Sequence, residues 1–475
     1  MSGQGPGGPS ARVPIDLRVP GRFHVVGVGG PGMSAIALVL AGMGHHVSGS
    51  DLHELPVLDR LRVAGVEVHV GHDRRLVDGV DAVTYSTAIP QHNVELTAAR
   101  ELGVPTLHRS GMLAGICACA RSIGVAGTHG KTTTTSMLAM ILTEAGFEPS
   151  FLVGGDVQEV GTSARWTGGP LLVVEADESD KTFLELPLAA TILTTVEVDH
   201  LDHWGTPAAL VAGFEQYLGA VDGPVVACSD DPLAARLGAA VGAVTYGTAE
   251  AADYRAVDVV AEHGVQTFTV VERGARLGSV RLPVRGVHMV RNATAALAMA
   301  RLQGAPFEAA AAALARFGGV ARRFDFRGEH DGITLVDDYG HLPSEIAATL
   351  EAAATSGDGW RRIVAVFQPN RYSRMAVLSP EYRDAFVRAD LTVITDIYPS
   401  GEAPLPGVTG ELVVDAIRDA HPDQPVVWVP RRDDLVDFLV HELRSGDVCV
   451  SMGCGDIASL PSEVLPRLQE RGDAR

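Results

Sequence analysis

The chain has 475 residues, of which 46% are hydrophobic and 20% are charged, as in an ordinary globular protein rather than a disordered one. Its formal net charge is −20, from 38 basic and 58 acidic residues, and this excess of negative charge disfavours nucleic acid or a membrane as a partner. At about 150 residues per domain, this length predicts three domains.

The chain carries no visible targeting or membrane segment. No apolar run approaches the roughly 18 residues of a membrane span, and "MSGQGPGGPSARVP" lacks the apolar core of a signal peptide. Residues 1–20 are rich in Gly, Pro and Ser and predict a flexible head. The five cysteines form no CxxC pair, so we expect a cytoplasmic protein without disulfides.

From residue 22 onward, short apolar runs alternate with helical patterns, which predicts parallel βαβ units. "RFHVVGVGG" is typical of a strand that runs into glycines, and "HHVSGSD" of a second strand that ends at Asp51. We place this first, Rossmann-like domain at residues 21–118.

A second series opens with the strand "SIGVAG" and a helix from 131 to about 146. Later apolar strands end abruptly in acids, and the residues after about 250 predict antiparallel hairpins. We place this central P-loop ATPase domain, a mostly parallel sheet plus a small antiparallel sheet, at residues 119–324. A third α/β series, again Rossmann-like, occupies residues 325–475. The predicted fold class is therefore α/β with three domains.

The stretch "GTHGKT" (127–132) predicts an ATP-binding loop, because a strand precedes it and a helix follows it. Lysine occurs only at positions 131 and 181, so the lysine inside the loop is the more telling one. Lys131 would meet the outer phosphates and Thr132 a magnesium ion. The alternative is a glycine turn before a threonine-capped helix.

A second glycine loop, "GVGGPGMS" (27–34), fits G-x-G-x-x-G, with Asp51 about 20 residues further on. Three interpretations stay open: NAD, a ligand with a nucleotide diphosphate, or a structural turn. The rival function from another class is accordingly an NAD-dependent oxidoreductase with a regulatory ATP domain.

Polar residues follow several predicted strands, where ligands of open α/β sheets bind. Glu175 and His200 are candidate magnesium ligands beside the ATP loop, although imidazole is unusual for so hard an ion. The paired arginines of "ARRFDFRGE" would either reach a transferring phosphoryl group or lie in a solvated linker. In the third domain, Arg371 and Arg374 would either bind a carboxylate or form surface salt bridges.

In their order and spacing, these motifs resemble the Mur ligases over nearly the whole chain after residue 20. The resemblance rests on "GVGGPGMSAIA", "GTHGKTTTTSM", "EADESD", "VDHLDHW", "ARRFDFRGE", "DDYGHLPSE", "FQPNRYSR" and "GEAPLPGVTG". It implies ATP-dependent addition of L-alanine to the lactyl carboxylate of UDP-N-acetylmuramate through an acyl phosphate, in peptidoglycan precursor synthesis. The alternative within the family is another amino acid or a recycled tripeptide.

The resemblance also implies roles for particular residues. Catalysis would depend on Lys131, Glu175, His200 and Arg323. Magnesium would be held by Thr132, Glu175 and His200. ATP would be bound by Gly127, Thr128, His129, Gly130, Lys131, Thr132, Thr133, His288, Asn292 and an acid of the pair Asp337 and Asp338. The sugar nucleotide would be bound by Gly27, Gly29, Gly30, Gly32, Met33, Ser34, Asp51 and Ser86. The amino acid would be bound by Tyr339, His341, Arg371 and Arg374.

Four positions depart from the family pattern. Thr195 stands where asparagine is common, and Met289 follows His288 where asparagine is frequent. Leu342 and Asn370 each replace a histidine near the expected amino-acid site and bear on selectivity for alanine. The tyrosine of "DDYGHLPSE", where the recycling branch usually has phenylalanine, favours alanine. The expected partners are UDP-N-acetylmuramate, L-alanine and ATP, with no nucleic acid and no membrane, and the expected state is a monomer or homodimer.

Overall fold

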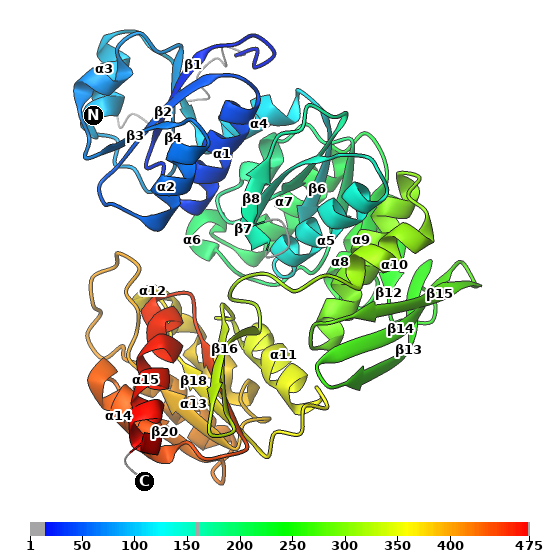
Figure 1. The fold of residues 1–475 in the computed structure, drawn as a ribbon, viewed down its shortest axis with the longest axis vertical. Helices are drawn as coiled ribbons and strands as arrows, with labels where there is room; N and C mark the ends of the chain where they lie inside the picture. The colour runs from blue at the N-terminus through cyan, green and yellow to red at the C-terminus, as the bar shows by residue number, and fades with distance from the viewer. Residues whose placement is uncertain (1–14, 158–160, 474–475) are drawn as a thin grey trace. The chain divides into compact units, whose positions relative to one another are not determined.

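A computed structural model describes residues 15–157 and 161–473 (Figure 1). Residues 1–14 of the predicted head lie outside the described residues. The chain divides into two compact units. The first takes in the described residues up to 156 and Thr162–Thr245, and the second takes in Tyr246–Arg301 and the described residues from Ala305 onward. No described helix is long and apolar enough to cross a membrane.

The N-terminal sheet has five parallel strands in the order β3-β2-β1-β4-β5. Its strands are β1 (Arg22–Val26), β2 (His46–Asp51), β3 (Glu67–Val70), β4 (Ala82–Tyr85) and β5 (Thr106–His108). Its helical segments are α1 (Pro31–Gly42), α2 (Pro56–Val63), η1 (Arg74–Val77), α3 (Val94–Glu101) and α4 (Arg109–Cys117). The strand order changes direction at β1 and β4, the type of point at which doubly wound sheets bind ligands.

The strands of the central segment follow the order β8-β7-β9-β6-β10-β11-β12. They are β6 (Arg121–Ala126), β7 (Ser150–Val157), β8 (Thr162–Arg165), β9 (Leu171–Glu175), β10 (Ala190–Leu193), β11 (Val225–Cys228) and β12 (Val244–Gly247). The helical segments are α5 (Lys131–Glu144), η2 (Thr182–Glu185), α6 (Leu201–Trp204), α7 (Pro207–Gly219) and α8 (Pro232–Ala240). β6 and its neighbours are apolar and buried because helices cover both faces of a parallel sheet.

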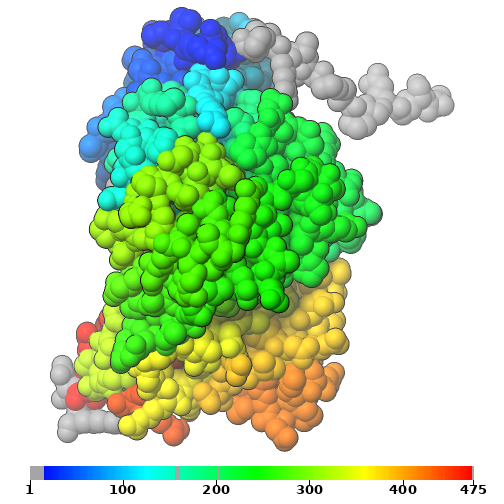
Figure 2. Space-filling view, turned by 90° about the vertical axis from the view of Figure 1, so that its right-hand side faces the viewer, coloured from blue at the N-terminus to red at the C-terminus, as the bar shows by residue number. Residues whose placement is uncertain are grey.

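The predicted hairpins are confirmed as three antiparallel strands, β13 (Tyr254–Glu262), β14 (Val265–Glu272) and β15 (Ala275–Leu282). They continue the strand order beyond β12, which pairs in parallel with β13. Their segment lies on the face that Figure 2 presents, in green. Two helices follow, α9 (Val287–Leu302) and α10 (Phe307–Leu314).

The C-terminal sheet has the order β16-β17-β21-β18-β19-β20, and only β16 is antiparallel to its neighbour. Its strands are β16 (Asp325–His330), β17 (Ile333–Asp338), β18 (Arg362–Phe367), β19 (Leu391–Ile394), β20 (Val426–Trp428) and β21 (Asp447–Met452). Its helical segments are α11 (Pro343–Ala354), α12 (Tyr372–Leu378), η3 (Ser379–Asp384), α13 (Glu411–Ala420), α14 (Arg432–Glu442), η4 (Asp456–Ser459) and α15 (Leu460–Asp473). β16 was not predicted, because its sequence resembles a charged linker.

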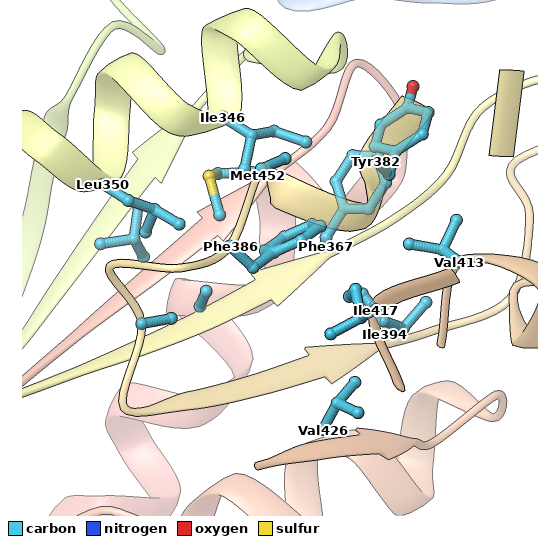
Figure 3. Close-up of a cluster of buried hydrophobic side chains, with 14 of the residues drawn as sticks. Ile346, Leu350, Phe367, Tyr382, Phe386, Ile394, Val413, Ile417, Val426 and Met452 are labelled. Atoms are coloured by element: carbon cyan, nitrogen blue, oxygen red, sulfur yellow. The ribbon is translucent and has the colours of Figure 1, made fainter. Parts of the chain in front are cut away.

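Two apolar clusters cover the two faces of this C-terminal sheet. In the first, Ile346 of α11 and Ile417 of α13 pack with Phe367 of β18 (Figure 3). In the second, Leu439 of α14 and Leu468 of α15 pack on the other face. The prediction of a Rossmann-like α/β fold for this part of the chain is therefore confirmed, with apolar packing on both faces of its sheet.

Candidate active site

The predicted ATP loop connects β6 to α5. Gly127 and Gly130 have φ values of +126° and +78°, which favour glycine. Space is also limiting at Gly127, because an added Cβ would lie 2.2 Å from Oγ1 of Thr194. Since β6 lies between β9 and β10, the carboxyl ends of three parallel strands meet around this loop.

Thr195, which follows β10, supports the loop from the side. Its carbonyl oxygen accepts a hydrogen bond from the amide of Thr128 at 2.8 Å, and its hydroxyl accepts one from the amide of His129 at 3.0 Å. The amides of Thr128 and His129 are therefore engaged by Thr195 in this structure, and the role of these two residues in binding ATP stays a prediction. Thr195 stands where asparagine is common in the family, and it supports the loop through these two hydrogen bonds.

Lys131 is the first residue of α5 and lies over the loop. Its Nζ donates hydrogen bonds to the carbonyl oxygens of Gly127 (2.7 Å) and Thr128 (3.2 Å) and to Oε1 of Glu178 (3.0 Å). Burial disfavours the ammonium, but the carboxylates of Glu178, Asp177 and Glu175 outweigh burial and raise the pKa of Lys131. The lysine therefore remains a cation although its side chain is largely buried.

Glu178 is the counterion of Lys131, and only 2% of its surface is exposed. Burial raises the pKa of Glu178 to about 7, while Lys131 opposes the shift. These tendencies conflict, since the raised pKa of Lys131 requires an ionised Glu178. Both carboxylate oxygens lie within 3.0 Å of Nζ, so the ion pair is the state that this geometry holds.

Thr132 and Glu175, two predicted magnesium ligands, are brought together. The Thr132 hydroxyl donates to Oε1 of Glu175 at 3.2 Å, and Oε2 of Glu175 accepts from the amide of Gly154 at 2.7 Å. Proteins usually hold Mg²⁺ with one or two carboxylates plus phosphate and water oxygens, so this pair fits the ion. Thr133 is buried on α5 and would contribute its backbone alone.

His200, the other predicted magnesium ligand, lies in the segment between β10 and α6. It has a φ of +54°, and its amide donates to Oδ1 of Asp199 at 2.7 Å. Its Nε2 lies 3.2 Å from Oδ2 of the same aspartate. Among the described residues, no three His, Cys, Asp or Glu side chains are grouped to hold a metal. The role of His200 stays a prediction.

The glycine loop of the first domain connects β1 to α1 and is bound to the end of β2. The amides of Gly27 and Val28 donate to the carbonyl oxygen of Ser50, and the amide of Gly29 donates to Oδ2 of Asp51 at 2.9 Å. Asp51 therefore shapes the loop directly. An added Cβ at Gly29 would lie 2.8 Å from that carboxylate, so this glycine is required by close packing.

The other predicted sugar-nucleotide residues surround the same loop. Gly30 precedes α1, and Gly32 lies in its first turn. Met33 and Ser34 are buried, so they would reach a ligand through their backbone. Ser86 follows β4, the other strand at the switch point.

Arg109, which the sequence did not single out, links the start of α4 to the acid-rich segment after β9. Its Nε donates to Oδ2 of Asp180 at 2.7 Å, and its Nη2 donates to Oδ2 of Asp177 at 2.8 Å. Burial would raise the pKa of both aspartates, but Lys131 and Arg109 together lower the pKa of Asp177, and Arg109 lowers that of Asp180. The run of acids in "EADESD" indicated that a cation would be needed nearby. Arg109 precedes the two aspartates by 68 and 71 residues, however, so the sequence did not reveal which cation it was.

The paired arginines precede β16 and both lie over the ring of Tyr339, at 5.1 Å for Arg322 and 5.3 Å for Arg323. Arg322 donates to Oδ2 of the buried Asp337 at 2.9 Å. Asp338 accepts from the amide of Phe324 at 2.7 Å. Both acids are therefore engaged in holding the linker, and burial raises the pKa of each.

The predicted ATP-binding residues His288 and Asn292 lie one turn apart on α9, and Asn292 is buried. A small cavity at the start of the same helix is lined by Arg285, Met289, Arg323 and other residues. Arg323, the predicted catalytic arginine, therefore lines the same cavity as Met289 at the start of α9.

The predicted amino-acid residues gather at the strand ends of the C-terminal sheet. The rings of Tyr339 and His341 meet edge to face at 5.5 Å. His341 is fixed by Glu345, whose Oε2 accepts from its amide at 2.9 Å, and by Tyr382, whose hydroxyl donates to its carbonyl oxygen at 2.7 Å. Arg371 and Arg374 lie at the start of α12.

Leu342, a departure from the family pattern, is 4% exposed at the start of α11. Its side chain is part of the packing that anchors this helix, and its amide donates to Glu345 at 3.2 Å. We therefore interpret this departure as a change in the core rather than in a ligand contact.

Comparison with known proteins identifies the family. Three models match consecutive parts of the chain: "Mur ligase family, catalytic domain" at residues 22–121, "Mur ligase middle domain" at 125–300, and "Mur ligase, glutamate ligase domain" at 322–455. A UDP-N-acetylmuramate–L-alanine ligase of Desulforamulus reducens is 42% identical over 457 residues, which cover 95% of this chain and 98% of that protein. This chain is a Mur ligase.

Other similar proteins support the same family assignment. A UDP-N-acetylmuramate–L-alanine ligase of Acidothermus cellulolyticus is 45% identical over 468 residues, with 96% of this chain and 97% of that protein covered. The crystal structure of UDP-N-acetylmuramate–alanine ligase from Thermotoga maritima matches with a TM-score of 0.80 and 29% identity, covering 95% and 100% of the two chains.

Family membership confirms the resemblance seen in the sequence and decides between the open interpretations. As a Mur ligase the chain is an ATP-dependent ligase, so the rival interpretation as an NAD-dependent oxidoreductase is set aside. The three-domain α/β fold class is confirmed as well.

Proposed function

We propose that this Mur ligase joins L-alanine to the lactyl carboxylate of UDP-N-acetylmuramate in peptidoglycan precursor synthesis, with ATP as the energy source. The supporting observation is near full-length identity of 42–45% to several proteins named UDP-N-acetylmuramate–L-alanine ligase. The ligase site agrees with this chemistry, since a lysine-bearing phosphate loop and a separate glycine loop belong to two predicted domains, 119–324 and 21–118. The third domain, 325–475, would receive the amino acid.

The reaction has to overcome repulsion between two anions. A lactyl carboxylate oxygen attacks the γ-phosphorus of ATP, the bond to ADP breaks, and an acyl phosphate forms. The amine of alanine then attacks the acyl carbon, the C–O bond breaks, and phosphate leaves. Lys131 and the amino end of α5 offset the negative charge that gathers in the first step. Arg323, which precedes β16, is proposed to add positive charge near the transferring phosphoryl group.

Thr132 and Glu175 would hold magnesium, with His200 proposed as a ligand of a second ion. When bound, Mg²⁺ supplies positive charge to the phosphate oxygens. The protein's own contribution is to hold the Thr132 hydroxyl and the Glu175 carboxylate 3.2 Å apart at the mouth of the ATP loop. The amide of Gly154 fixes the direction of that carboxylate.

The amino acid would bind at Tyr339, His341, Arg371 and Arg374. Two guanidinium groups are suited to a carboxylate, and binding through the carboxylate leaves the amine of the amino acid available as the nucleophile. We propose a cytoplasmic monomer or homodimer, with no nucleic acid and no membrane among its partners.

A panel of acceptors tests the function. The purified chain is incubated with ATP, Mg²⁺ and UDP-N-acetylmuramate, together with alanine, serine, glycine or the tripeptide, and phosphate release is measured. Alanine is expected to give the highest kcat/KM. A clear preference for the tripeptide would indicate a ligase of the recycling branch instead. Phosphate release that does not depend on any acceptor would contradict ligase activity.

A further inference from the structure

Glu95, in the first turn of α3, is a carboxylate with no exposed surface, and it takes no part in the reaction proposed above. Its Oε2 accepts a hydrogen bond from the hydroxyl of Ser50 at 2.7 Å, and its Oε1 accepts one from the amide of Asp73 at 3.1 Å. Two histidines also face Oε2: Nδ1 of His72 lies at 3.2 Å and Nε2 of His24 at 3.5 Å. One buried acid therefore connects β1, β2, the segment after β3, and α3.

The charge of Glu95 is stabilised by these partners. Burial would raise the pKa of Glu95, but His24, Ser50 and His72 together lower it below its usual value. The acid is therefore ionised at neutral pH and accepts at both oxygens. A buried network whose members are paired in this way favours one arrangement of the segments that it joins.

The contacts also fix where the hydrogens of this cluster lie. The Ser50 hydroxyl donates its single hydrogen to Glu95, so its oxygen can only accept from Nδ1 of His72, which lies 3.0 Å away. Nδ1 of His72 therefore carries a hydrogen. Since the amide of Asp73 is a donor as well, donors approach both oxygens of Glu95. Only a carboxylate accepts at both of its ends.

Ser50 also holds the glycine loop that follows β1. Its carbonyl oxygen accepts from the amides of Gly27 at 2.8 Å and Val28 at 2.9 Å. The next residue, Asp51, accepts from the amide of Gly29 at 2.9 Å. Two consecutive residues of β2 thus bind three consecutive amides of the loop, and the position of Ser50 decides how the loop leaves β1.

We propose that Glu95 is a positioning residue for the sugar nucleotide: it fixes Ser50, and through the Ser50 carbonyl it fixes the glycine loop at residues 27–34. This inference rests on the proposed function, which assigns that loop to UDP-N-acetylmuramate. Glu95 acts through the loop and needs no contact with the substrate. The role accounts for a charged residue beside Leu96 and Ala99, which belong to an apolar cluster of the same helix.

The discriminating change is Glu95→Gln, which keeps the shape of the side chain but replaces one acceptor by a donor. The backbone amide of Asp73 can only donate, so the glutamine oxygen has to face it. The NH₂ group is then left against the hydrogens of Ser50 and His72. KM for UDP-N-acetylmuramate is expected to rise roughly tenfold or more, the range for a lost hydrogen bond to a buried charge.

KM for ATP and KM for alanine are expected to stay within about twofold of the parent values in this variant, because the change is confined to the glycine loop. Each KM is measured with the other two substrates saturating. Glu101→Gln is the matched control, since Glu101 lies at the end of the same helix and forms an exposed ion pair with Arg74. It is expected to leave all three KM values unchanged.

Ser50→Ala tests the proposed route from Glu95 to the loop. It removes the hydroxyl that Glu95 binds but keeps the carbonyl that binds the loop, and the same selective rise in KM for UDP-N-acetylmuramate is expected. The double variant is expected to be no more than about twofold worse than the worse single variant, because both changes break one connection. Should Glu95→Gln fail to fold, Ser50→Ala alone supplies the test of selectivity.

Three results would overturn the proposal: an unchanged KM for UDP-N-acetylmuramate in the folded variants, an equal rise in all three constants, or effects that multiply in the double variant. Failure of the proposed function has a different signature. The parent chain itself would then release no phosphate in response to UDP-N-acetylmuramate and alanine, whatever stands at position 95.

Discussion

Replacing Lys131 with alanine is expected to lower kcat by a factor of about a hundred to a thousand, the usual cost of removing one preorganised donor from a developing anion. The ammonium lies over the loop carbonyls of Gly127 and Thr128 and is kept charged by three carboxylates. When ATP is bound, we expect the same cation to meet the transferring phosphoryl group. Phosphate release with saturating substrates measures the effect.

This variant needs two controls, because Glu178 loses its counterion in a buried position. An unpaired buried charge costs about 3–5 kcal/mol, and Glu178 reduces that cost by taking up a proton. Its pKa is raised in the folded state, so the stability loss is expected to be small at acidic pH and to grow as pH rises above about 4.3, the value for an unperturbed glutamate. Melting temperatures at several pH values separate this effect from catalysis.

The double variant Lys131→Ala with Glu178→Gln removes the unpaired charge and is expected to recover stability but not turnover. Lys181→Ala removes the only other lysine and is expected to retain activity. Near-normal turnover in the folded Lys131→Ala protein would show that this loop does not serve catalysis.

Replacing Glu175 with glutamine is expected to lower kcat by roughly a hundredfold and to raise the Mg²⁺ concentration needed for half-maximal activity. Glutamine keeps an oxygen that can accept from the amide of Gly154, so the fold around β9 is preserved. What is lost is the negative charge next to the Thr132 hydroxyl. A titration of activity with Mg²⁺ measures both effects.

Glu215→Gln is the matched control, since Glu215 is exposed on α7 in the same segment of the chain. It is expected to leave kcat and the Mg²⁺ requirement unchanged. A Glu175→Gln protein with the parent's Mg²⁺ dependence would exclude Glu175 as a metal ligand.

The strands that carry the site could be predicted because they are buried on both faces and therefore consist of short, nearly uninterrupted apolar runs. "RSIGVA" and "RIVAVF" are examples, and both form strands as expected. The phosphate loop was predictable because its signal is local. Its glycines lie within a few residues of the strand, and their positive φ values favour glycine.

The contacts that tune the site could not be predicted, because they join residues far apart in the chain. Arg109 reaches Asp177, and Asn370 reaches Ser400, through tertiary packing that no local pattern reveals. β16 was missed for a different reason: it lies at an edge of the sheet, so its residues are mostly polar.

The central claim is that ATP activates the lactyl carboxylate as an acyl phosphate. UDP-N-acetylmuramate labelled with ¹⁸O in both oxygens of that carboxylate tests it directly, with mass spectrometry of the phosphate released during ligation of alanine. Because the acyl C–O bond breaks in the second step, each phosphate is expected to carry one ¹⁸O atom. Unlabelled phosphate, formed together with the alanyl product, would contradict the account.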